Sequence, residues 1–278
     1  MKQKSYNGSP TLYLVPTPIG NLEDITIRAL NILKEVDIIF AEDTRVTKQL
    51  LTHFNINKKL ISSHLYNEEN NENREINYLR EGKNIAVVSD RGTPVISDPG
   101  YILAKTAIEE GFNVVCLPGP TAVIPAIVMS GLAGGPFTFY GFLNSKESKR
   151  EKELETLKNQ TFPIAFYEAP HRIEKTIKSI IKVFGNRKAS IVREISKKFE
   201  EVIRGDLEYL LKEVPNIKGE LVLVVDGNHE INNFENLPIK KHVELYIDDG
   251  LTPNEAIKKV AKERNIPKSN VYNEYHGL

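Results

Sequence analysis

The sequence contains a single cysteine, Cys116, among 278 residues. A single cysteine cannot form an intramolecular disulfide, and zinc sites built from several cysteines are excluded as well. Neither sign of charge is in excess, because 37 Lys and Arg residues balance 37 Asp and Glu residues. Overall charge therefore gives no indication of nucleic-acid binding, and any RNA-binding surface has to be local.

Long hydrophobic runs are also lacking. No uncharged apolar stretch reaches the roughly 18 residues that a membrane-spanning helix needs. Residues 1–10 are polar, lack the apolar segment of a signal peptide and are expected to be disordered. These features predict a soluble, cytoplasmic protein. Apolar residues still make up 40% of the chain, enough for two modest domains and a tail.

Several common enzyme signatures are missing as well. The sequence contains no Gly-x-Gly-x-x-Gly fingerprint, no Gly-x-x-x-x-Gly-Lys-Ser/Thr phosphate loop and no Gly-x-Ser-x-Gly elbow. Dinucleotide and nucleoside-triphosphate binding therefore lose support. His, Asp and Glu residues show no clear metal-ligand spacing, so we expect no bound metal.

Short apolar segments alternate with helix-like segments over residues 11–132, the predicted first domain. The apolar segments are rich in Val, Ile and Leu rather than strictly alternating, which is typical of strands buried on both faces of a parallel sheet. Strand–helix alternation at this spacing predicts an α/β domain. The expected strands are residues 11–15, 37–41, 60–63, 84–89 and 113–117, and the expected helices are 25–35, 46–54, 68–81, 101–110 and 122–130.

A second, mixed α/β domain is predicted over residues 137–228, after a Gly- and Pro-rich linker at 131–136. Its last three expected strands, 189–193, 200–204 and 220–226, follow one another and so indicate antiparallel pairing. Residues 238–278 are predicted to be a tail of two or three helices. Within it, Thr252, Pro253 and Glu255 have the pattern of a capped helix start.

Three predicted strands of the first domain end in turns rich in Gly and Pro, at residues 16–21, 89–94 and 118–121, here called the rim turns. In an open α/β sheet, ligands bind beyond the carboxyl ends of the strands. Gly lets the backbone approach a ligand closely, and Pro fixes the turn. Any one of these could be an ordinary tight turn. Three at one edge of one sheet favour a preformed ligand site.

The most specific signal is an ordered set of segments: TLYLVPTPIGN (11–21), AEDTR (41–45), VSDRGTPVISDP (88–99), LPGP (117–120), FYEAPHR (166–172), REISK (193–197) and Gly219-Glu220. Together they resemble the bacterial 16S ribosomal RNA cytidine 2′-O-methyltransferase family of the tetrapyrrole-methylase superfamily. The resemblance extends from Thr11 to the tail. It implies two α/β domains with S-adenosylmethionine in the cleft between them, a homodimer, and methylation of a cytidine ribose in the decoding region of 16S ribosomal RNA.

The resemblance also implies a set of cofactor-binding residues that hold the cofactor largely through main-chain groups. They are Pro16, Asp90, Gly92, Thr93, Pro94, Thr121, Ala122, Phe166, Tyr167 and Glu220. Arg91 departs from the family, which usually has a small residue there. Its guanidinium could contact the cofactor carboxylate, an RNA phosphate or only solvent.

Methyl transfer to a ribose 2′-hydroxyl needs that oxygen in line with the activated methyl group and a group that accepts its proton. Glu42, Asp43 and Lys197 are the candidate catalytic residues. Lys197 could act as a base only if burial or a nearby cation lowered its pKa. Alternatively, Glu42 and Asp43 beside Arg45 form a helix start with a local ion pair, and Lys197 lies in a solvated turn.

Local basic groups are the candidates for RNA binding, because guanidinium groups stay protonated and fork onto phosphate. The candidates are Arg45, His64, Arg172, Arg193, Lys258, Lys259 and Lys262, with a further basic group at Lys146, Lys149, Arg150 and Lys152. Charge runs on helices could equally face solvent. Two other functions stay open: a methyltransferase of the same fold acting on a tetrapyrrole or protein side chain, and a non-catalytic RNA-binding assembly factor.

Overall fold

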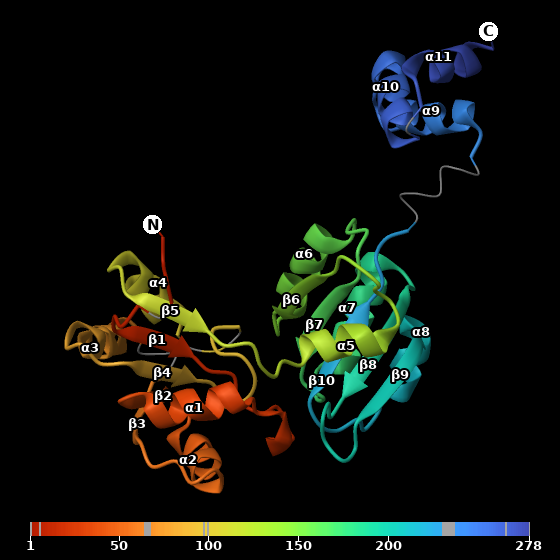
Figure 1. The fold of residues 1–278 in the computed structure, drawn as a ribbon. Helices are drawn as coiled ribbons and strands as arrows, with labels where there is room; N and C mark the ends of the chain where they lie inside the picture. The colour runs from red at the N-terminus through yellow and green to blue at the C-terminus, as the bar shows by residue number, and fades with distance from the viewer. Residues whose placement is uncertain are drawn as a thin grey trace.

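The computed structural model describes residues 2–5, 7–63, 68–96, 98, 100–229, 237–264 and 266–277, with the backbone alone for 68–73. The chain forms two α/β domains and a separate bundle of helices near the C-terminus (Figure 1). This is the α/β organisation with a helical tail that the sequence predicts.

The first domain is built on a parallel sheet with strand order β3-β2-β4-β1-β5. Its strands are β1 (Thr11–Leu14), β2 (Ile38–Ala41), β3 (Lys59–Ser62), β4 (Ile85–Val88) and β5 (Asn113–Cys116). Its helices are α1 (Ile27–Glu35), α2 (Thr44–His53), α3 (Glu68–Arg80) and α4 (Tyr101–Glu109), with a short 3₁₀ turn η1 (Leu22–Asp24) before α1. Each element lies within about two residues of its predicted place, and the differences are confined to the ends.

The sheet of the first domain is buried on both faces, as its Val- and Ile-rich strands predict. Strand β2 shows how, because Ile39 packs with α1 and α2 on one face while Phe40 packs with α3 and α4 on the other. Successive side chains of a strand point to opposite faces, so a strand covered on both sides needs apolar residues at every position. The carboxyl ends of these strands are therefore the part of the sheet open to a ligand.

The second domain contains a mixed sheet with strand order β6-β7-β10-β8-β9, in which only the β6–β7 pair is parallel. The predicted antiparallel pairing of its later strands is confirmed. The strands are β6 (Thr138–Phe142), β7 (Ile164–Glu168), β8 (Lys188–Arg193), β9 (Glu201–Asp206) and β10 (Leu221–Val225). Helices α6 (Glu147–Leu157), α7 (Ile173–Phe184) and α8 (Leu207–Glu213) pack against one face. Helix α8 was not expected from the sequence.

Helix α5 (Val123–Ser130) covers the other face of the second sheet, although the sequence pattern groups it with the first domain. Val123, Ala126 and Ile127 pack there against β7, β8 and β10. Arg204 Nε on β9 also donates to the carbonyl of Met129 at 3.0 Å. The chain therefore crosses between the domains at the third rim turn, residues 118–121, rather than at the linker expected at 131–136.

The tail is a bundle of three helices within the described residues: α9 (Ile239–Asp248), α10 (Pro253–Glu263) and α11 (Lys268–His276). Its own small core contains Val243, Ile257, Val260 and Val271. The predicted capping box is present, because the backbone N–H of Thr252 donates to the Glu255 carboxylate at 3.0 Å. Figure 1 shows this bundle standing apart from both α/β domains.

Candidate active site

The three rim turns meet at the carboxyl edge of the first sheet. Thr17 and Gly92 exchange backbone hydrogen bonds, each of 2.9 Å between nitrogen and oxygen. The Thr93 hydroxyl donates to the carbonyl of Pro120 at 3.2 Å. Gly119 lies so close to Pro16 that a Cβ added to it would be 2.7 Å from the proline Cβ. The Gly and Pro pattern of the sequence thus corresponds to one continuous rim.

A cavity of about 290 Å³ lies between this rim and the second sheet. Its size is at the lower end of the range of small-molecule sites, and its walls are mainly apolar with a few polar groups, as such sites usually are. The walls come from the first domain (Ile19, Arg91, Gly92, Thr93, Ile96, Asp98), from the crossover (Thr121, Ala122) and from the second domain (Phe142, Tyr167, Glu168, Val192, Ile195, Glu220, Leu221, Val222).

Six of the ten implied cofactor-binding residues line this cavity: Gly92, Thr93, Thr121, Ala122, Tyr167 and Glu220. Pro16 and Pro94 are buried within the rim turns, where they fix the backbone. Asp90 lies outside the walls and accepts a hydrogen bond of 3.0 Å from the backbone N–H of Asp43. This bond joins the loop after β2 to the second rim turn.

Phe166 does not face the cavity. It is fully buried on the opposite face of the second sheet, among the side chains of α6, α7 and α8. Strand alternation sends Phe166 and Tyr167 to opposite faces, so only one of this pair can line the cleft. The expectation for Phe166 is therefore corrected to a core residue.

Tyr167 connects the second sheet to the crossover. Its ring packs edge-to-face against Phe139 and Phe142, with centroid distances of 4.8 and 5.6 Å. Burial raises the pKa of its phenol, and hydrogen bonding with the Thr121 side chain opposes that rise. The phenol therefore stays protonated at neutral pH and fixes the crossover relative to β7.

Asp98 is an acidic residue of the cavity wall that was not predicted from the sequence. It lines the cavity, and burial raises its pKa from 3.8 to about 6, with added repulsion from Glu42 and Asp90. Perturbed carboxylates in clefts are typical of functional sites. The only sequence signal was its place near the end of the segment VSDRGTPVISDP (88–99).

Asp43 is a helix cap rather than a base. Its carboxylate accepts from the backbone N–H of Arg45 at 2.8 Å at the start of α2, and it pairs with the Arg45 guanidinium at 2.7 Å. Hydrogen bonds from the Arg45 side chain and backbone lower the pKa of Asp43 to about 2. A carboxylate this acidic is a poor proton acceptor near neutral pH. The alternative of a helix start with a local ion pair therefore holds for Asp43 and Arg45.

Lys197 is held between two carboxylates. Its Nζ lies 2.8 Å from Glu194 Oε1 and 2.8 Å from Glu220 Oε2. These contacts place Lys197 in an ion-pair cluster with both carboxylates, and Lys197 is not among the residues that line the cavity. The aliphatic part of the side chain covers Gly20 of the first rim turn, where an added Cβ would overlap it. Lys197 thus bridges the two domains beside the cavity.

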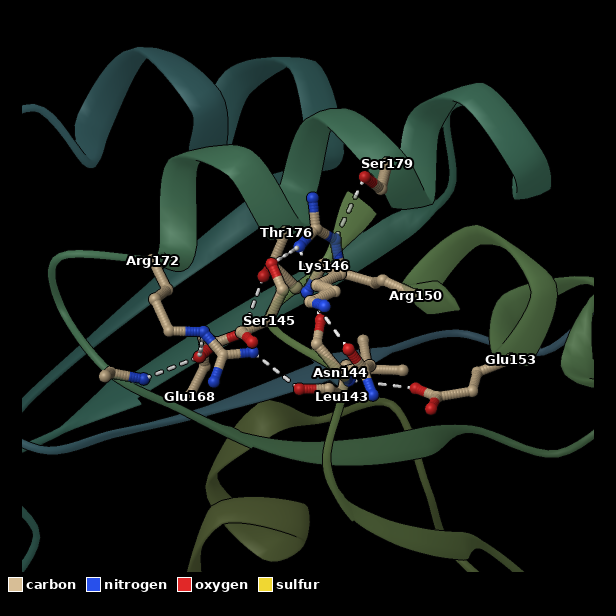
Figure 2. A network of polar contacts seen from close by, with 11 residues as sticks. Leu143, Asn144, Ser145, Lys146, Arg150, Glu153, Glu168, Arg172, Thr176 and Ser179 are labelled. Atoms are coloured by element: carbon tan, nitrogen blue, oxygen red, sulfur yellow. Dashed lines mark hydrogen bonds and ion pairs between the residues drawn. The ribbon is translucent and has the colours of Figure 1, made fainter. Parts of the chain in front are cut away.

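Arg172 belongs to a structural network on the second domain (Figure 2). Its Nε lies 3.1 Å from the buried carboxylate of Glu168, and its Nη2 donates to the carbonyl of Leu143 at 2.5 Å. The Thr176 hydroxyl donates to the other oxygen of Glu168 at 2.5 Å. Arg150 is 3% exposed and donates to Ser179 Oγ at 3.0 Å. These contacts hold the loop between β6 and α6, and Arg150 therefore cannot contribute to a basic surface.

The remaining RNA-binding candidates are dispersed. Arg193 pairs with Glu201 and donates to the carbonyl of Lys218 at 3.2 Å, beside a second cavity on the second domain. His64 lies outside the described residues. The tail lysines on α10 are exposed; they are Lys258, Lys259 and Lys262. The ammonium of Lys259 lies 3.9 Å from the centre of the Tyr246 ring.

Within the part of the chain that the structure describes, no group of three His, Cys, Asp or Glu side chains could hold a metal ion. Among those same residues, no helix combines the length and the apolar character needed to cross a membrane.

Comparisons with known proteins agree with this architecture. The profile of the family "Tetrapyrrole (Corrin/Porphyrin) Methylases" matches residues 11–211. The methyltransferase CobJ has a similar structure, with a TM-score of 0.60 and 18% identity over 79% of this chain and 95% of that one. Uroporphyrin-III C-methyltransferase from Thermus thermophilus, solved with S-adenosylhomocysteine, has a TM-score of 0.57 and 18% identity over 78% and 97% of the two chains.

Relatives at higher identity match along nearly the whole chain. "Ribosomal RNA small subunit methyltransferase I" of Bacillus subtilis is 47% identical, covering 99% of this chain and 98% of the relative. The protein of the same name from Xylella fastidiosa is 39% identical, covering 94% and 97%. The chain therefore belongs to the tetrapyrrole methylase family and, within it, to the ribosomal RNA small subunit methyltransferases I.

Proposed function

We propose that this chain transfers a methyl group from S-adenosylmethionine to the 2′-oxygen of a cytidine ribose in the decoding region of 16S ribosomal RNA. Family membership makes it an S-adenosylmethionine-dependent methyltransferase of small-subunit ribosomal RNA. The proposal adds the atom, the nucleotide and a homodimer, as the sequence resemblance implies, and the cytoplasmic location predicted from the composition. The observation that carries it is the cavity enclosed by the rim turns and the second sheet.

The residues of this cavity suit the methyl donor. Ile19, Ile96 and Val192 offer apolar walls for a nucleoside, while Gly92, at φ +80°, forms part of the wall without a side chain. The Asp98 carboxylate at the same cavity suits a cationic sulfonium. When bound, S-adenosylmethionine supplies the electrophilic methyl group. The protein has to hold the ribose oxygen in line with that group and to accept its proton.

We assign proton acceptance to Asp98, with Glu42 tuning it. Asp98 lines the cavity, and its raised pKa of about 6 places it near the pH at which a general base works best. Repulsion by Glu42 contributes to that rise. Glu42 itself does not line the cavity. We therefore propose that it acts through Asp98, and not as the proton acceptor that the sequence analysis considered.

A pH–rate profile tests this division of roles. Asp98→Asn should lower the rate of a single turnover at neutral pH by about 10²-fold or more, in the range of lost general-base catalysis. Glu42→Gln should keep most of the rate but move the acid limb of the profile to lower pH, because one source of repulsion is gone. Asp248→Asn, an exposed carboxylate on the tail, is the control. A wild-type rate for Asp98→Asn would refute the assignment.

Mapping of ribose methylation tests the function as a whole. Small ribosomal subunits from cells lacking the protein would be incubated with purified protein and methyl-labelled S-adenosylmethionine, and the labelled nucleotide identified by digestion and mass spectrometry. The proposal expects one 2′-O-methylcytidine in the decoding region. Label on a base, or in a tetrapyrrole offered in parallel, would favour a different methyltransferase. Tight subunit binding without label would favour an assembly factor.

The tail is the part of the chain best suited to hold RNA away from the cavity. Its lysines on α10 are exposed, and the bundle stands apart from both α/β domains (Figure 1). Phosphate contacts position a nucleic acid without reading its sequence, so this bundle would supply affinity while the cavity selects the nucleotide.

A further inference from the structure

Glu220 lies at the cavity between two cations that come from different domains. Arg91, in the second rim turn of the first domain, places Nη1 against Glu220 Oε1. Lys197, in the loop between β8 and β9 of the second domain, places Nζ 2.8 Å from Glu220 Oε2. Each oxygen of one carboxylate thus serves a different cation, and the arrangement bridges the cleft.

The two cations are not equivalent. Lys197 has a second carboxylate, Glu194, at 2.8 Å, its side chain is 24% exposed, and its methylene groups pack over Gly20. The side chain of Arg91 is 56% exposed, and Glu220 is the ion-pair partner that the described residues offer it. Exposed ion pairs contribute little net stability and are easily replaced. Lys197 is therefore the fixed member of the cluster, and Arg91 is the exchangeable one.

Arg91 also faces the space where a ligand would enter, because both it and Glu220 line the cavity. A guanidinium presents a planar fork of N–H donors that matches the two oxygens of a carboxylate or a phosphate. The donor and the RNA proposed above both carry such oxyanions. When a ligand oxyanion takes the place of the Glu220 carboxylate, Glu220 keeps its contact with Lys197, so this carboxylate is not left without a cationic partner.

We propose that Arg91 is an exchangeable anion-binding residue of the cleft. Its guanidinium gives up the ion pair with Glu220 and binds an oxyanion of the incoming ligand, while Lys197 stays paired with Glu220. The proposal rests on the function proposed above. The oxyanion is either the carboxylate of the methyl donor or a phosphate of the RNA, and the two sources are separated by experiment.

The exchange predicts that substitutions at Arg91 and Lys197 lower the affinity for the oxyanion, whereas a substitution at Glu220 raises it. Arg91→Ala removes the cation and should weaken oxyanion binding about two- to fivefold, the size expected for an exposed charge pair. Lys197→Met keeps the methylene stem but leaves Glu220 to compete for Arg91, so binding should also weaken. Glu220→Gln removes the competitor and should strengthen binding. Arg80→Ala, which breaks an exposed pair with Glu110 between α3 and α4, is the matched control.

Calorimetry on the full chain would use S-adenosylhomocysteine and 5′-methylthioadenosine, which lacks the carboxylate. If Arg91 binds the donor, the three variants change affinity for the first ligand and not for the second. If it binds RNA phosphate, both small ligands bind as in the wild type. Single-turnover methylation of subunits then shows weaker RNA binding for Arg91→Ala and a salt dependence shallower by about one phosphate contact.

Wild-type affinities for both small ligands and for RNA in Arg91→Ala would overturn the exchange. Weaker binding in Glu220→Gln would also overturn it, because Glu220 would then be a ligand rather than a competitor. Either result is distinguishable from failure of the proposed function, since the wild-type protein would still place its methyl group on the subunit RNA in the same assay.

Discussion

The contact between the first and third rim turns leads to a sharp test of how the cleft is built. In Gly119→Ala, the new methyl group would lie 2.7 Å from Pro16 Cβ and 2.9 Å from Pro16 Cγ. A proline ring cannot rotate away, so the two turns have to separate. Gly119 does not adopt a left-handed backbone conformation, and the expected effect is therefore a matter of space.

Overpacking of this kind costs about 2 kcal/mol, which corresponds to a fall of roughly 4–8 °C in the melting temperature of a domain this size. Affinity for S-adenosylhomocysteine should fall as well, because Thr121 ends the displaced turn, Ala122 follows it, and both line the cavity. Thermal unfolding followed by circular dichroism and titration calorimetry measure both effects. Gly134→Ala is the control, since a Cβ there meets no atom within 4 Å. A Gly119→Ala protein as stable as that control, with unchanged affinity, would refute the packing of the rim.

Three further predictions concern charge. Burial and repulsion from Glu42 and Asp90 raise the pKa of Asp98 from 3.8 to about 6, so the folded state resists ionisation and loses stability as pH rises through this range. Asp98→Asn should therefore stabilise the protein at pH 7.5 by about 1 kcal/mol after allowance for solvent screening, with no gain below pH 4, in urea unfolding. Burial and the nearby Arg264 lower the pKa of the fully buried His242 below 6.5. The tail bundle should therefore lose stability as the pH falls below 6.5. An imidazole NMR titration and urea unfolding midpoints at pH 5.5 and 7.5 measure this loss. The exposed tail lysines are Lys258, Lys259 and Lys262. Replacing all three by glutamine should reduce the salt dependence of RNA affinity by about two to three phosphate contacts. An unchanged slope of log affinity against log salt concentration would exclude the tail from the RNA interface.

Much of the fold could be predicted because its strands are short runs of apolar residues and its helices have clear ends. Helix α5 shows where this reasoning fails. Its sequence, VIPAIVMS, is apolar on every side, so periodicity cannot say against which sheet it packs. Only the contacts with β7, β8 and β10 place it on the second domain. Helix α8 has 7 residues, too few for a helical period to stand out between two strands.

The candidate site could also be predicted in part from the sequence. Gly and Pro mark the rim turns because close backbone approach and fixed turns require those residues. The direction of a side chain from a strand is a different matter, since Phe166 and Tyr167 are both aromatic and only the position of the cleft decides between them. The environment of Lys197 was also hidden, because Glu220 is 23 residues away along the chain.

We expect the cavity between the rim turns and the second sheet to bind the methyl donor. A crystal structure of the protein with S-adenosylhomocysteine tests it most directly. We expect the ligand in contact with Gly92, Thr121 and Tyr167. Density for the ligand in the second cavity beside Arg193 and Phe199, or no ligand in the rim cavity at saturating concentration, would contradict this assignment.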